Sequence, residues 1–390
     1  MILFNDALNT VLNTNVLMGA ESVDLHTAIG RVLSENIISD IDMPPFNKAA
    51  MDGFAICESD IKNELTIIET VAAGQTPTKK VELGTATKIM TGAPVPEGAD
   101  FVIQVELSEM VGENKVRFTG HPRNNIIALA EDVKTGDIVL KKGQKIDARH
   151  IAVLASVGCN KPKVYKQPKV GIISTGNELV EPQNSPGLSQ IRNSNGHQLV
   201  AQALQCNALV EYFGIVEDDY KKTYNAIKNG IDTCDILLLT GGVSMGDFDF
   251  VPKIMTDLGI NILFDRVAVQ PGKPTTFGKK GDKFIFGLPG NPVSSFVQFE
   301  IFVKPLLKKI TNQQHKPNLI KLPLGKDFSR KKSERKSLIP INISNSSEVF
   351  TTEYHGSAHI YALPNADGLA IIEKGIKELK KGDLVDVRLF

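Results

Sequence analysis

Apolar residues in the first twelve positions recur at helical spacing, at Leu3, Phe4, Ala7, Leu8, Val11 and Leu12. This spacing predicts a helix with one buried side. A second apolar segment at residues 28–33 leads to the double proline Pro44-Pro45, which fixes an extended connector rather than a helix. We therefore expect a mixed region of helix and strand over residues 1–49.

The pattern changes to short strands separated by turns over residues 50–133. The expected strands are Leu65–Val71, Ala86–Met90, Phe101–Val105 and Val116–Phe118. Such spacing is typical of a small β-barrel or sandwich. Residues 134–167 return to a strand and a helix and end in a linker rich in Lys and Pro at 162–168. The pattern thus predicts a β subdomain inserted into the N-terminal region.

Short apolar strands alternate with helices over residues 168–312. The expected strands include Val170–Ser174, Leu209–Val216, Ile236–Thr240 and Phe284–Gly287, and a long helix is expected from 293 to 310. This alternation predicts a doubly wound parallel sheet. Period-two alternation returns over residues 318–390 and predicts a small C-terminal β-barrel. The expected fold class is therefore α/β plus β, in several domains.

Composition excludes several classes of protein. The 390 residues, 42% of them hydrophobic, can bury a sizeable core. Basic and acidic residues are equal at 44 each, so no overall field would recruit nucleic acid or a membrane surface. The four cysteines form no CxxC pair, which argues against zinc and against a disulfide framework. No apolar run reaches about 18 residues. We expect a cytoplasmic protein without a membrane span.

Candidate chemistry lies where three predicted strands end. The loops are Thr175–Glu178, Gly241–Asp249 and Gly290–Val293. In a parallel sheet these loops converge at one edge. Gly241 and Gly242 would let backbone N–H groups approach an anion, and Ser244 adds a hydroxyl. The carboxylates of Glu178 and Asp249 can hold a divalent cation.

Each of these residues also has a structural interpretation. Glu178 fits a solvated loop acid, and Asp249 fits the cap of a helix at 251–258, a role compatible with metal binding. Asn291 suits an N-cap and Pro292 the first helical position, which would leave the following N–H groups free for an anion. The same loop also fits a plain turn into a helix.

Standard nucleotide motifs are absent from the sequence. Gly241 and Gly246 have the spacing of a phosphate-binding loop, but Asp247 stands where the lysine should be. No GxGxxG opens a strand–helix unit. Lys273, between Gly272 and Pro274, is either a phosphate contact in a constrained loop or part of a surface turn.

Six motifs together resemble the molybdopterin molybdenumtransferase family. They are AMDGFA at 50–55, MTGAPVPEGAD at 90–100, STGNEL at 174–179, GGVSMG at 241–246, PGKP at 271–274 and LPGNPVS at 288–294. The resemblance covers essentially the whole chain. It implies an enzyme that inserts molybdate into adenylylated molybdopterin and releases AMP. It also implies Mg²⁺, a homodimer, and a site shared between the α/β domain of one subunit and the N-terminal region of the other.

The resemblance carries roles to individual positions. Asp52, Thr91, Glu178 and Asp249 match functional polar positions, with Mg²⁺ on Glu178 and Asp249. The resemblance also carries Asp132, Pro289, Pro292 and Ser357 over as substrate contacts. The strand-end loops themselves add the predicted contacts Gly241, Gly242, Ser244, Lys273, Asn291 and Ser294. Pro289 and Pro292 match the loop associated with molybdate.

The sequence departs from the family pattern at three places. Arg330 and Arg335 fit the spacing of a basic motif, but Lys332-Ser333 replaces its Glu-Phe core. Gln270 stands where many members carry a basic residue, which affects one expected anion contact. Asn193 replaces a common aspartate.

Two other functions stay open at this point. A molybdopterin adenylyltransferase, or a relative acting on pyridine nucleotides, would use the same α/β domain but would leave Asp52 and Thr91 without a role. A dimeric scaffold similar to the C-terminal part of gephyrin would serve an interaction partner. A molybdopterin adenylyltransferase is also the expected donor of the substrate.

Overall fold

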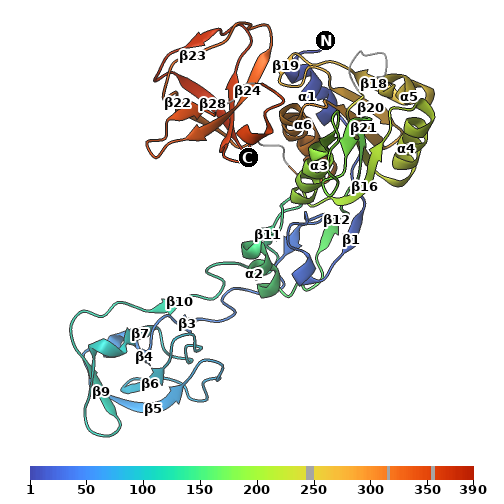
Figure 1. The fold of residues 1–390 in the computed structure, drawn as a ribbon. Coiled ribbons are helices and arrows are strands. Elements are labelled where there is room, and N and C mark those ends of the chain that lie inside the picture. Colours follow the sequence, from blue (N-terminus) through green and yellow to red (C-terminus); the bar gives the residue numbers. More distant parts are fainter. Residues whose placement is uncertain (243–249, 314–316, 353–355) are drawn as a thin grey trace.

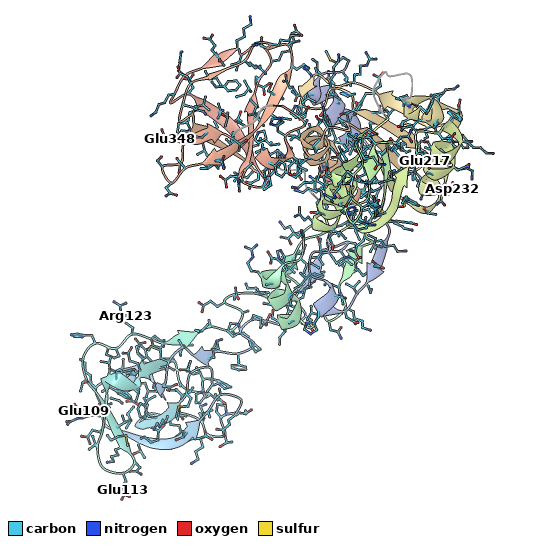
Figure 2. The ribbon with its side chains drawn as sticks, in the orientation of Figure 1. Glu109, Glu113, Arg123, Glu217, Asp232 and Glu348 are labelled. Atoms are coloured by element: carbon cyan, nitrogen blue, oxygen red, sulfur yellow. The ribbon has the colours of Figure 1, made fainter. Side chains whose placement is uncertain are left out.

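The structure is a computed structural model that describes residues 1–242, 250–313, 317–352 and 356–390. The molecule is elongated, with the α/β domain and the C-terminal β region together at one end and the β subdomain at the other (Figure 1). Figure 2 shows the labelled side chains of Glu109 and Glu113 at the outer end of the β subdomain, and those of Glu217 and Asp232 on the α/β domain. The fold class predicted from the sequence is confirmed.

One six-stranded sheet forms the β subdomain. Its strands, in spatial order, are β7 (Phe101–Gln104), β4 (Gly53–Ile56), β6 (Thr85–Ile89), β5 (Leu65–Val71), β9 (Lys115–Phe118) and β8 (Ser108–Met110). Phe54, Leu65 and Ile103 are buried in its core. The chain enters and leaves this subdomain side by side, because β3 (Lys48–Ala49) pairs with β10 (Ile126–Ile127) and Met43 bridges Val133.

Short paired segments connect the β subdomain to the α/β domain. Strand β1 (Ala20–Ser22) pairs with β12 (Lys163–Tyr165), and β2 (Ile37–Ile38) pairs with β11 (Ile138–Leu140). Helix α2 (Ala148–Ser156) is capped by the Asp147 side chain. The segment 162–168, expected to be a linker, contains strand β12. The sequence-based domain limits stay predictions.

The α/β domain contains a six-stranded mixed sheet. Its order is β16 (Leu209–Val216), β13 (Lys169–Thr175), β17 (Ile236–Thr240), β21 (Lys283–Leu288), β20 (Thr276–Lys280) and β18 (Asn261–Phe264). The first four are parallel, as predicted, but β20 is antiparallel to both of its neighbours. Only Gly281 and Asp282 separate β20 from β21, and a connection this short cannot make a parallel crossover.

Helices cover both faces of this sheet (Figure 1). One face packs on α1 (Phe4–Leu12), α3 (Ser194–Gln205), α6 (Pro292–Gln298) and α7 (Lys304–Ile310), and the other on α4 (Tyr220–Thr233) and α5 (Val251–Asp257). The amphipathic N-terminal helix thus belongs to the core of the α/β domain. The helix expected over 293–310 contains a π-helical turn, η4 (Phe299–Val303), between α6 and α7.

The C-terminal strands curl into a small barrel. Their order is β25 (Val349–Thr351), β24 (Lys336–Ile343), β26 (Gly368–Ile372), β28 (Leu384–Leu389) and β22 (Leu319–Pro323), and Leu324 bridges Val349 to bring the last strand back to the first. Strand β19 (Val269–Gln270), from the α/β segment, adds to β24. Among the described residues, no helix has the length and apolar character needed to cross a membrane.

Candidate functional site at the strand ends of the α/β domain

Three parallel strands of the α/β sheet end in register. Ser174 of β13 pairs with Thr240 of β17, which pairs with Leu288 of β21. A Cβ atom on Gly241 would lie 2.3 Å from the carbonyl oxygen of Thr175, so two of the loops approach each other as closely as glycine allows. The expected convergence is thus found for the loop starts. Ser244, Asp247 and Asp249 lie outside the described residues.

A cavity of about 620 Å³ opens at this edge. Its lining residues from the α/β domain include Thr175, Glu178, Gly241, Asn291 and Pro292. The C-terminal domain contributes Ala358, Ile360 and Tyr361. The cavity therefore lies between two domains, and predicted site residues from all three strand ends line it.

The Glu178 carboxylate lies against the backbone turn at Gly176. Gly176 has φ +148°, and a Cβ atom there would lie 2.5 Å from Glu178 Oε2. The backbone oxygen of Glu178 accepts a hydrogen bond from the Ile191 N–H group. The position of the Glu178 carboxylate beside the cavity therefore depends on the glycine at 176.

The predicted anion site at the start of α6 is partly wrong. Asn291 occupies the N-cap position, but its side chain makes no capping hydrogen bond and donates instead to Ser357 Oγ at 2.9 Å. The Val293 N–H group donates to the Ser357 carbonyl at 3.0 Å, and the Ser295 N–H group to the Asn291 carbonyl. The docked C-terminal domain and the helix itself thus use two of the three N–H groups expected to be free, and leave Ser294.

Asn195 connects two strand ends and was missed by the sequence analysis. Its amide nitrogen donates to Thr240 Oγ1 at 2.9 Å and to the Gly290 carbonyl at 2.7 Å. Asn195 Oδ1 and Thr175 Oγ1 are buried and have no hydrogen-bond partner within the described ranges. The only sequence signal was an asparagine at the start of a helix, which alone indicates no ligand.

Asn193 organises a second polar chain beside the cavity. Its Oδ1 accepts hydrogen bonds from Ser174 Oγ and from the Gly196 N–H group, which caps α3. Its amide nitrogen donates to Tyr212 Oη at 2.7 Å, and Tyr212 donates to Glu181. Burial raises the pKa of Tyr212. An aspartate at 193 would have no N–H to donate, so the amide fixes the direction of this chain.

Lys273 lies at the same edge of the sheet but does not line the 620 Å³ cavity. Strand β20 begins at Thr276, opposite Gly287 near the end of β21. Gln298 fixes the preceding loop, because its Nε2 donates to the Pro271 carbonyl and its Oε1 accepts from Thr275 Oγ1. The Lys273 side chain is exposed.

A basic cavity of about 390 Å³ lies between this loop and the barrel. Its lining includes Gln270, Pro271, Arg330, Lys331, Lys332 and Arg335. The Arg330 guanidinium donates to the carbonyls of Ile376, Arg335 and Glu373, and burial lowers the pKa of Arg330. Arg335 donates to the Val269 carbonyl at 3.2 Å. Both arginines thus hold backbone in place, and their charge also contributes to the field in this cavity.

The remaining predicted site residues lie away from the strand ends. Asp52 Oδ1 accepts hydrogen bonds from the Thr91 N–H group at 2.6 Å and from Thr91 Oγ1 at 2.7 Å. These bonds hold the pKa of Asp52 below its ordinary value. Asp132 lines a cavity of about 450 Å³ beside α2. Within one chain, the β subdomain that carries Asp52 and Thr91 is separated from the α/β edge (Figure 1).

The described part of the chain contains no cluster of three or more His, Cys, Asp or Glu side chains that would form a metal site on its own. Glu178 supplies one carboxylate beside the cavity. Mg²⁺ is commonly held by one or two carboxylates together with phosphate oxygens of a substrate. The donor set therefore fits Mg²⁺ that is shared with a phosphorylated ligand.

The fold and the cavity define a multidomain protein built around an α/β domain with a ligand-sized cavity at its strand ends. Residues 171–309 match the family model described as a probable molybdopterin binding domain. Residues 2–158 match the MoeA N-terminal region (domain I and II), and residues 321–390 match the MoeA C-terminal region (domain IV).

Full-length relatives agree with these matches. The molybdopterin molybdenumtransferase of Staphylococcus epidermidis is 33% identical, over 98% of this chain and 94% of that protein. The one from Staphylococcus aureus is 34% identical over the same shares. The crystal structure of the molybdopterin biosynthesis moeA protein from Pyrococcus horikoshii OT3 covers 100% of both chains, with a TM-score of 0.87 and 31% identity. The chain belongs to the molybdopterin molybdenumtransferase family, a family of molybdenum cofactor biosynthesis. The family predicted from the sequence is confirmed.

Proposed function

We propose that this chain inserts molybdate into the dithiolene of adenylylated molybdopterin and releases AMP. The observation that carries the proposal is the single cavity at which Glu178, Gly241 and Asn291 meet. Its volume of about 620 Å³ is in the usual range for small-molecule sites. The relatives that match the whole chain bear the name of this activity.

The substrate's anionic groups would bind at the glycine-rich strand ends. Gly241 and Gly242 both have positive φ, at +92° and +62°. The Gly241 N–H group donates to the Leu288 carbonyl at 3.4 Å, so the proposed backbone contact of this turn with an anion is Gly242. Ser294, Asn291 and Lys273 would add polar and cationic contacts at the same edge. The substrate's own thiolates take the molybdenum, so no nucleophilic side chain is needed.

Glu178 and Asp249 are the proposed ligands of Mg²⁺. When bound, this ion would supply Lewis-acid polarisation of the pyrophosphate link and so favour departure of AMP. Glu178 holds its carboxylate over Gly176 at the cavity wall, in reach of such a ligand. Measuring turnover as a function of the free Mg²⁺ concentration tests this assignment.

The complete site is proposed to form in a homodimer. Asp52, Thr91 and Asp132 belong to the N-terminal half, and the β subdomain lies far from Glu178 within one chain (Figure 1). In a twofold-symmetric dimer, the N-terminal half of one subunit can face the α/β domain of the other. We also propose a molybdopterin adenylyltransferase as the donor of the substrate.

A cytoplasmic location is part of the same proposal. The four cysteines are free thiols, the state that reducing compartments maintain.

The test is an assay of the purified protein with adenylylated molybdopterin, molybdate and Mg²⁺. AMP release and formation of active cofactor are the expected results. Absence of AMP release under these conditions rejects the transferase. An adenylyltransferase would instead consume ATP and molybdopterin and release pyrophosphate, so the same preparation separates the two enzyme activities.

A further inference from the structure

Part of the lining of the 620 Å³ cavity is apolar. Six of its lining residues form this apolar part: Leu179, Pro186, Ile191, Ala358, Ile360 and Tyr361. The first three follow β13, where β14 (Leu179–Val180) pairs with β15 (Ile191–Arg192) and fixes the loop. The other three belong to the C-terminal domain. The cavity therefore has two apolar walls, one from each domain.

Tyr361 is the aromatic member of these walls. It belongs to the short helix η5 (Ile360–Ala362) and is 88% exposed. It also lines a second cavity, of about 710 Å³, together with Asn342, Thr352, His359 and Asn365. No aromatic ring stacks on Tyr361 within the described ranges. An aromatic face that is exposed beside a polar cavity is available to a planar ligand.

Two polar lining residues of the same cavity have buried oxygen atoms without a hydrogen-bond partner. Asn195 is 9% exposed and Thr175 is 3% exposed, and Asn195 Oδ1 and Thr175 Oγ1 find no partner among the residues that the structure describes. Buried acceptors of this kind are normally satisfied. The protein covers both atoms, so they act on a ligand in the cavity through their partial negative charge rather than by direct contact.

We infer that Tyr361 stacks on a planar nitrogen heterocycle of the substrate and positions it between the two apolar walls. This inference rests on the proposed function, whose substrate carries two such rings, a pterin and an adenine. Both rings have a flat π-face for Tyr361 and an amino group that the partial negative charge of the two covered oxygen atoms favours. Tyr361 is thus assigned as a positioning residue that the C-terminal domain contributes.

Direct binding of single rings tests this inference without turnover. The probes are AMP and neopterin, with inorganic pyrophosphate as a ligand that has no ring, measured by calorimetry and by pterin fluorescence. Removal of a stacking side chain costs roughly 5- to 150-fold in affinity. We expect Tyr361→Ala to weaken binding of the stacked ring by this factor and to leave pyrophosphate binding unchanged. Tyr361→Phe should stay within about twofold of wild type, because it keeps the ring.

The matched control is Leu384→Ala, which removes another exposed apolar side chain of the C-terminal domain, 64% exposed and away from the cavity lining. It should change none of the three affinities. Dependence of AMP binding on Tyr361 identifies the adenine as the stacked ring, and dependence of neopterin binding identifies the pterin.

Three outcomes overturn the inference. In the first, Tyr361→Ala binds both rings with wild-type affinity. In the second, Tyr361→Phe loses as much ring affinity as Tyr361→Ala. In the third, the wild-type protein binds neither ring. A protein that releases AMP in the transferase assay but shows one of these outcomes keeps its function and loses this role for Tyr361. A protein that binds rings through Tyr361 but releases no AMP keeps this role for Tyr361 and loses the proposed function.

Discussion

Two aspartates of the N-terminal half each accept two hydrogen bonds from one threonine. Asp52 binds the N–H and hydroxyl groups of Thr91, and Asp42 binds those of Thr135 at 2.7 and 2.9 Å. In each pair the backbone hydrogen bond is the main cause that lowers the pKa of the aspartate, and the hydroxyl is the second. Asp52 is therefore kept ionised and oriented at an exposed position.

Substitution of Thr91 by valine should raise the pKa of Asp52 part of the way toward its ordinary value of 3.8. The hydroxyl bond is lost, while the stronger backbone bond remains. Because the folded-state pKa is depressed, the stabilisation from Asp52 is present above pH 3.8 and lost as pH falls through the folded pKa. In Thr91→Val the stabilisation should be smaller, and its loss should be complete at a higher pH. Carboxyl carbon NMR titration measures the shift.

Thr135→Val is the matched control for this titration. It should raise the pKa of Asp42 and leave that of Asp52 unchanged. Equal Asp52 titration curves in wild type and Thr91→Val would contradict the assigned role of the hydroxyl.

Gly176→Ala should abolish most AMP release by displacing Glu178. The new Cβ atom would lie 2.5 Å from Glu178 Oε2, so the carboxylate has to move. The left-handed backbone adds a stability cost of roughly 1 to 3 kcal/mol. We expect turnover close to that of Glu178→Ala, with folded protein by circular dichroism.

The control for backbone strain is Gly375→Ala. Gly375 also has a positive φ, at +92°, but its added Cβ would meet no atom within 4 Å. This variant should lose comparable stability and keep its turnover. Wild-type rates in Gly176→Ala would mean that the position of Glu178 is unimportant.

At the residue scale, the sequence predicted side chains attached to strand ends and missed those that act across the fold. Glu178, Gly241 and Asn291 follow strands directly, so their place at one edge follows from a parallel sheet. Asn195 meets Thr240 and Gly290 only after β17 and β21 are paired, 45 and 95 residues away. The local pattern of residues along the chain does not predict such contacts.

At the element scale, strands were predicted well because their apolar runs are short and separated by turns. Strands β5, β16 and β17 have the predicted limits. The antiparallel β20 was not predicted, since the direction of a strand depends on the length of its connection. The π-helical turn η4 was also missed, because hydrophobic spacing alone does not distinguish it from α-helix.

Glu300, within η4, holds the barrel on the α/β domain. Its carboxylate accepts from Lys304 Nζ at 2.7 Å and from Gln202 Nε2 at 3.0 Å, and its backbone carbonyl accepts from Arg388 of β28. Glu300 is 5% exposed and Arg388 is 8% exposed. The interface between the two domains thus contains a buried charged cluster.

Glu300→Ala should therefore destabilise the protein strongly. The substitution should cost roughly 1 to 3 kcal/mol, because buried Gln202 Nε2 loses its carboxylate acceptor. Lys304 is partly exposed and can be solvated, and the backbone bond to Arg388 remains. Urea denaturation followed by circular dichroism measures the loss.

Asp232→Ala is the matched comparison for Glu300→Ala. Asp232 pairs with Lys228 at the same i,i+4 spacing, but both side chains are more than half exposed. Its loss should cost at most about 0.5 kcal/mol. Equal effects of the two substitutions would show that burial of the Glu300 cluster contributes nothing.

At the scale of the whole molecule, one chain carries the proposed site in two separate parts. Glu178 lies at the α/β edge, and Asp52 and Thr91 lie in the distant β subdomain (Figure 1). Local pattern could not predict this separation, because it depends on how the domains are connected; only the family resemblance implied a site shared between subunits. The proposed homodimer provides a route by which the two parts can meet.

Mixing two inactive variants tests this arrangement. Asp52→Ala and Glu178→Ala chains each lack one part, and a mixed dimer has one site with both parts intact. After denaturation and joint refolding at equal amounts, AMP release should recover to about a quarter of wild type, since about half of the dimers are mixed and each has one intact site of two. Each variant refolded alone is the control. No recovery would place both parts of the site in one chain.

The paired segments at Met43 and Val133 also constrain how the β subdomain can move. Two antiparallel segments, which pair with each other at β3 and β10, connect the β subdomain to the rest of the chain. Such a double-stranded stem resists independent twisting of either stretch more than a single tether would. Asp52 and Thr91 lie in the β subdomain beyond this stem and are hydrogen-bonded to each other. They would therefore approach or leave a neighbouring subunit as one rigid pair.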